Sequence, residues 1–94
     1  MKALFVIVSD PRKSHRPAEA IRIAAGVAAW KKVDVSVYLY GDAARILDDT
    51  TGDFVDEEHF TRYLPMLEQR NIYAHKDDQE FARLTKEHSV VTWF

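Results

Sequence analysis

KALFVIVS (2–9), PAEAIRIAAGVAAWKK (17–32) and VDVSVYLYG (33–41) follow one another at the start of the chain and decide its fold. The first segment is continuously apolar, which indicates a parallel strand covered on both faces. The second begins with a proline, a residue favoured in the first turn of a helix. The third is rich in β-forming residues. Together they predict a strand, a helix and a second strand, the unit from which parallel sheets are built.

The second strand differs from the first in its pattern. Val33, Val35, Val37 and Leu39 alternate with polar or amphipathic residues, a period of two that is typical of a strand with one face less covered. We therefore expect the first strand at the centre of the sheet and the second toward an edge.

The rest of the chain continues the alternation of helices and strands less regularly. A short helix is expected over 43–47, and a later helix should bend or divide at Pro65, because proline removes a helical hydrogen bond. Short strands over 72–74 and 89–94 flank a last helix. The sequence thus predicts a three-layer α/β/α fold with a parallel four-stranded sheet in the flavodoxin-like order 2-1-3-4.

Length and composition limit the number of domains and the classes of partner that the protein can have. Ninety-four residues suit one domain, 1–94. Thirteen Lys and Arg against fifteen Asp and Glu give a charge of −2, so no nucleic-acid partner is expected. The chain has no cysteine, which excludes thiol chemistry of its own. The first apolar run stops at Ser9-Asp10-Pro11 and no membrane span is visible, so we expect a soluble, cytoplasmic protein.

Helix 17–32 is unusual because small and apolar residues surround it after Arg22. Such a helix can pack closely against another helix, either in the same chain or in a second subunit, and the sequence leaves both open. Trp30, Trp93 and Phe94 are candidates for a contact surface, with core packing as the alternative.

A ligand site is expected where the strand order reverses, beyond the carboxyl ends of the strands. In the order 2-1-3-4 that point lies between the first and third strands, which brings together loop 9–16 and loop 75–78. The first loop, SDPRKSHR, is basic and precedes a helix N-terminus, where an anion is favoured. No glycine-rich phosphate motif is present, so the alternative that these are solvated charges stays open.

The second loop places His75 beside carboxylates, an arrangement that can support acid–base chemistry or bind a metal. The preferred interpretation is that Asp77 caps the last helix and that the others are ordinary loop residues. The four histidines lack a zinc-ligand spacing, and Ser9 lacks a nucleophile-elbow context. The sequence identifies no catalytic residue, no metal ligands and no cofactor motif. The candidate ligand-binding residues are Ser9, Arg12, His15, Arg16, Gly41, Asp42, His75, Lys76 and Asp78.

Four segments share the layout of a known family: AEAIRIAAGVAAW (18–30), VDVSVYLYG (33–41), GDAARIL (41–47) and the closing VVTWF (90–94). They resemble the DsrE/DsrF-like family, which includes the sulfur-relay subunits TusB, TusC and TusD. The resemblance implies a parallel α/β fold and assembly into trimers or hexamers. Some members carry persulfide sulfur on a cysteine after the third strand, but the corresponding segment here, AHKDD (74–78), contains no thiol.

This departure removes the sulfur-carrying role from the chain unless a partner supplies the cysteine. The expected function is therefore that of a non-catalytic DsrE/DsrF-like protein, a homo-oligomeric accessory or interaction protein related to sulfur relay, with a sulfur-relay protein as a possible partner. The alternative is a small anion- or nucleotide-binding protein, or an enzyme, that uses the cleft between loops 9–16 and 75–78. In that alternative His75 is the acid–base residue, and Arg12 and Arg16 hold the anion.

Overall fold

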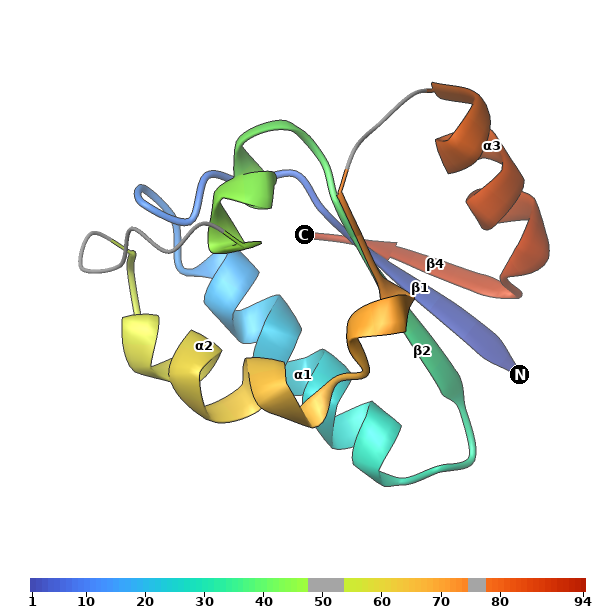
Figure 1. Ribbon diagram of the computed structural model, residues 1–94, viewed down its shortest axis with the longest axis horizontal. Helices are drawn as coiled ribbons and strands as arrows, with labels where there is room; N and C mark the ends of the chain where they lie inside the picture. Colours follow the sequence, from blue (N-terminus) through green and yellow to red (C-terminus); the bar gives the residue numbers. More distant parts are fainter. Residues whose placement is uncertain (48–53, 75–77) are drawn as a thin grey trace.

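A parallel four-stranded sheet with helices on both faces forms the framework of the protein (Figure 1). The computed structural model describes residues 1–47, 54–74 and 78–94, and it confirms the predicted α/β class. The elements are β1 (Lys2–Ile7), α1 (Arg16–Ala29), β2 (Asp34–Leu39), the 3-10 helix η1 (Gly41–Leu47), α2 (Glu57–Tyr63), the 3-10 turns η2 (Leu64–Met66) and η3 (Gln69–Asn71), β3 (Ile72–Ala74), α3 (Asp78–Glu87) and β4 (Val90–Trp93).

The strand order is β3-β2-β1-β4, so the predicted order 2-1-3-4 is wrong. β1 lies in the interior as expected, but β2 also lies in the interior and not toward an edge. The alternating pattern of β2 was misleading because its second face is covered as well. Ser36 and Tyr38 on that face are 8% and 0% exposed, and the ring of Phe81 from α3 lies 4.9 Å from that of Tyr38.

α1 covers one face of the sheet, and α2 lies on the same side and packs against α1 (Figure 1). Side chains from β1 and β2, among them Phe5 and Val37, form the main core together with α1. Ala24 and Ala25 of α1 are fully buried, and the helix contacts both strands and α2. The alanines on this side of α1 thus pack within the chain, whereas Gly26 and Ala29 are exposed. A subunit contact through the exposed side stays a prediction.

α3 lies on the opposite face and covers only part of it (Figure 1). Its Leu84 is 1% exposed and packs, together with Phe81, against Leu4 and Val6 of β1. Within the described part of the chain, α3 is the lone helix on this side.

Pro65 divides the helical segment as predicted. α2 ends at Tyr63, and the chain continues as the 3-10 turn Leu64–Met66 with Pro65 in its first positions. Proline lacks the N–H group that an α-helix needs at this point, so the chain tightens and turns toward β3. Among the described helices, none has the length and apolarity that a membrane crossing requires.

Candidate functional site

The observed strand order moves the point of reversal to the gap between β1 and β4. The segment that follows β1 is fastened there to the end of β4. The backbone N–H groups of Val8 and Ser9 donate to the carbonyl oxygen of Phe94 at 3.0 and 3.4 Å, and the Ser9 hydroxyl donates to the same oxygen at 3.2 Å. Ser9, a predicted ligand residue, is thus engaged in joining β1 to β4.

Arg12 in the basic loop is turned back onto Asp10. The Asp10 carboxylate accepts hydrogen bonds from the backbone N–H of Arg12 at 2.9 Å and from its guanidinium at 3.2 and 3.0 Å. These bonds to Arg12, the side-chain ones first, hold the pKa of the Asp10 carboxyl below its ordinary value. The charge of Arg12 is therefore largely matched within the loop.

His15 and Arg16 stand at the start of α1. The Nε2 atom of His15 lies 3.8 Å from the carboxylate of Glu19, with both side chains exposed, and the backbone N–H of Arg16 donates to the Ser14 hydroxyl at 3.1 Å. His15 is in the N-cap position, but its side chain makes no capping bond. An anion at this end of α1 would meet the exposed side chains of Lys13 and Arg16.

Gly41 and Asp42 lie next to the basic loop because β1 and β2 are neighbours. The N–H of Tyr40 donates to the carbonyl of Ile7 at 2.9 Å, which aligns the ends of the two strands. Gly41 adopts φ +63°, a conformation that glycine takes without strain, and Asp42 lies 3.6 Å from Arg45 in an exposed ion pair. The structure thus brings together the loops that follow the first two strands.

The cleft expected between loops 9–16 and 75–78 depended on the order 2-1-3-4. In the structure β2 separates β1 from β3, so the two loops do not follow neighbouring strands. Asp78 opens α3, which lies on the face opposite α1 (Figure 1), and His75 and Lys76 lie outside the described residues. The role of these residues in ligand binding stays a prediction.

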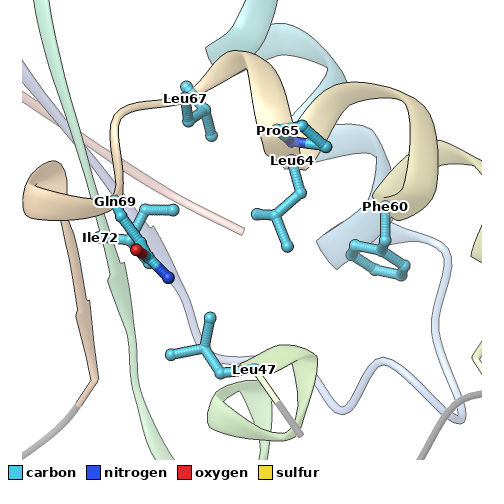
Figure 2. Close-up of a pocket in the computed structure, with 7 residues that line it drawn as sticks. All are labelled: Leu47, Phe60, Leu64, Pro65, Leu67, Gln69 and Ile72. Carbon is cyan, nitrogen blue, oxygen red and sulfur yellow. The ribbon is translucent and has the colours of Figure 1, made fainter. Parts of the chain in front are cut away.

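An apolar pocket on the α1 side of the sheet is the feature that the sequence did not predict (Figure 2). Its volume is about 430 Å³, within the range of about 300 to 1,000 Å³ that small-molecule sites occupy. Gln69 is the polar residue on its wall, and its amide projects toward the cavity in Figure 2. The apolar lining consists of Leu47, Phe60, Leu64, Pro65, Leu67 and Ile72.

The pocket exists because η2 diverges from the sheet at Pro65 and η3 brings the chain back to β3. Phe60 and Leu67 are nearly buried and form part of the core, whereas Leu47 is 45% exposed at the rim. The sequence indicated the bend at Pro65 but gave no sign that the space beneath it stays open. The described residues contain no cluster of His, Asp or Glu side chains suited to a metal ion.

The geometry defines an α/β protein with a parallel four-stranded sheet, which is consistent with a flavodoxin-like or DsrE-like fold although the strand order differs from the predicted one. Among solved structures, the crystal structure of the ychN protein from E. coli, which has a DsrE/TusB-like fold, is similar to this chain with a TM-score of 0.75. The match covers 100% of this chain and 99% of that chain at 16% identity, so it shows the fold alone. No family model matches the chain, and no curated protein matches it in sequence.

Proposed function

We propose that this protein is a non-catalytic, DsrE/DsrF-like accessory protein that assembles with copies of itself and acts through its surfaces in sulfur relay. The observation that supports this proposal is the match to a DsrE-like fold over the full length of a chain that contains no cysteine. A persulfide needs a thiol on the carrying chain. The chain therefore contributes contacts, and a partner contributes the reactive sulfur.

Exposed aromatic and apolar side chains supply the surfaces that such a role needs. Trp30 is 65% exposed at the end of α1, and Trp93 is 53% exposed on β4. The ammonium group of Lys32 lies 5.6 Å from the centre of the Trp30 ring. Large exposed aromatics are enriched in protein interfaces.

The proposal is tested by mixing the purified protein with a cysteine-bearing DsrE/DsrF-like subunit of the same organism, loaded with persulfide. We expect a complex in size-exclusion chromatography with light scattering, and a changed rate of sulfur transfer from that subunit to an acceptor thiol. Trp30→Ala should weaken the complex, while Met66→Ala, at an exposed position on η2, serves as its matched control. Absence of both a complex and an effect on transfer would contradict the proposal.

A second candidate function, binding of a small apolar molecule, is supported by the pocket beneath Pro65. Its apolar lining and the Gln69 amide, the polar side chain among the described lining residues, suit a compact aromatic molecule that carries one hydrogen-bonding group. This candidate replaces the anion site in the predicted cleft as the form of ligand binding that the geometry favours.

Indole, with one N–H donor, is a suitable probe for the pocket. At 100 times its dissociation constant, a ligand adds about 2.7 kcal/mol of stability, so the melting temperature should rise in a thermal-shift measurement. Ile72→Trp fills the pocket and should abolish the rise, while Met66→Trp adds the same side chain at an exposed position and should leave it unchanged. A rise that survives Ile72→Trp would place binding elsewhere.

A further inference from the structure

β4 forms one edge of the sheet, and its outer side is open to solvent. It pairs with β1 on one side, and no strand lies on the other within the described part of the chain. Val90 and Trp93 are 41% and 53% exposed, and Thr92 is also exposed. The open side therefore presents both backbone groups and apolar side chains to solvent.

Edge strands normally carry features that prevent pairing with another chain, such as lysine, proline or an inward-pointing charge. The sequence of β4, Val-Val-Thr-Trp, contains neither a charge nor a proline, and all four residues favour strands. β3, at the other edge, is only three residues long and its residues are partly buried. β4 is thus the edge suited to accept another strand.

The backbone hydrogen bonds of β4 determine which groups are available. The N–H of Phe94 donates to the carbonyl of Val6 at 2.8 Å, and the carbonyl of Phe94 accepts from Val8, so this residue faces β1. Because backbone direction alternates along a strand, Thr92 also faces β1, whereas Val91 and Trp93 direct their N–H and C=O groups outward.

We propose that β4 pairs antiparallel with β4 of a second copy of this chain, across a two-fold axis perpendicular to the sheet and centred on Thr92. In this register Val91 is opposite Trp93 of the second copy, so that both outward-facing residues of each chain exchange their hydrogen bonds. Thr92 is opposite itself in a non-hydrogen-bonded pair. A register shifted toward Ser89 would be poorer, because the Ser89 N–H already donates to the Lys2 carbonyl at 2.9 Å.

The same register covers apolar side chains on both faces of the joined sheet. Trp93 contacts Phe81 at 5.7 Å between ring centres and so lies on the α3 face, and it would meet Val91 of the second copy there. Phe94 contacts Phe5 on the α1 face and would meet Val90 of the second copy. The exposed atoms of Val90 and Trp93 are thereby removed from water.

This inference deepens the proposed self-assembly, on which it rests, by naming one interface and its symmetry. A two-fold contact of this kind uses the same patch on both chains. A simple three-fold trimer contains no such contact, whereas a hexamer made of two trimers does. Of the two assemblies that the family resemblance implies, β4 pairing favours the hexamer.

Oxidative cross-linking tests the register directly, since the native chain has no cysteine. Cα atoms of a non-hydrogen-bonded antiparallel pair are about 4.5 Å apart, within the range that a disulfide spans. Thr92→Cys should therefore form a disulfide-linked dimer when oxidised glutathione is added to the folded protein. Val90→Cys is the matched control, because its two copies would lie roughly 13 Å apart in this register.

We expect Thr92→Cys to cross-link at least about tenfold faster than Val90→Cys and than Trp30→Cys, which reports random collisions of an exposed site. Circular dichroism verifies that each variant is folded. A rate for Thr92→Cys no higher than either control would overturn the proposed pairing. If the native protein still has a mass above one chain in that case, the proposed assembly stands and only this interface is rejected.

Charge substitutions provide an independent test of the same position. Thr92→Lys and Thr92→Glu each place like charges directly opposite one another, which destabilises a cross-strand pair. Each variant alone should therefore have a smaller mass in sedimentation velocity than the native protein, and an equimolar mixture should recover the larger mass. Native-like mass for both single variants would overturn the proposal.

Discussion

Asp10 and Arg12 show at the scale of single residues that part of the basic loop's charge is matched within the loop. We expect Arg12→Gln to raise the pKa of the Asp10 carboxyl, because the bonds that lower it come mainly from Arg12. A carboxylate with a lowered folded-state pKa contributes stability above its unfolded pKa and loses it as the pH falls through the folded one. The stability difference between native protein and variant should therefore close at acidic pH.

NMR titration of the Asp10 carboxyl, combined with urea unfolding at several pH values, measures both effects. Arg16→Gln is the control, because Arg16 is not among the residues that lower this pKa. An unchanged Asp10 titration in Arg12→Gln would show that the pair is not formed in solution.

Gly41 and Gly26 form a matched pair for testing backbone conformation. Gly41 has φ +63°, so Gly41→Ala should destabilise the protein by about 1 to 2 kcal/mol. Gly26 lies on the exposed side of α1 with open space around its Cα, and Gly26→Ala should stabilise by about 0.5 to 1 kcal/mol. Urea unfolding compares them, and the same sign for both changes would contradict this assignment.

Single residues also mark the limit of sequence reasoning about the candidate site. The basic character of SDPRKSHR could be predicted from the sequence. The hydrogen bonds from Arg12 to Asp10 and from the Ser9 hydroxyl to the Phe94 carbonyl could not. The first arises from a local turn, in which the N–H of Lys13 donates to the Asp10 carbonyl. The second joins residues at the two ends of the chain and required knowledge of strand order.

At the scale of elements, we expect α3 to contribute strongly to the free energy of unfolding. Among the described helices, it alone covers its face of the sheet. Leu84 is 1% exposed and packs on β1 and β2 residues, so Leu84→Ala should cost about 2 to 5 kcal/mol in urea unfolding. Met66→Ala, at a position that is 52% exposed, should stay within about 0.5 kcal/mol of the native protein. Equal effects of the two changes would show that α3 is not packed on the sheet.

The elements themselves were largely predictable, and their order was not. Local signals predicted the elements. These signals are the apolar runs, Pro17 at the start of a helix and Pro65 at the end of another. β3 could pair with β1 or with β2. The alternation in β2 suggested that β2 is an edge strand and that β3 therefore pairs with β1. However, Tyr38 of β2 is an apolar ring with one polar atom and is fully buried under Phe81.

At the scale of the whole molecule, the fold alone does not determine the function. The chain has a fold similar to that of the ychN protein, and it contains no cysteine that could carry sulfur. The exposed aromatic residues and the unprotected β4 edge are the features from which we infer assembly. The sequence indicated assembly through the family resemblance, the small-residue helix and the candidate aromatic contacts. The predicted order 2-1-3-4 already placed the last strand at an edge, but beside the third strand and not beside β1 as observed.

The measurement that tests this account most directly is the mass of the purified protein in dilute solution, by size-exclusion chromatography with light scattering. We predict a mass of more than one chain, with a lower mass for Thr92→Lys because the β4 contact is lost. A single-chain mass over the whole concentration range would contradict the account, since an accessory protein without a thiol and without self-association would retain only its fold in common with the proposal.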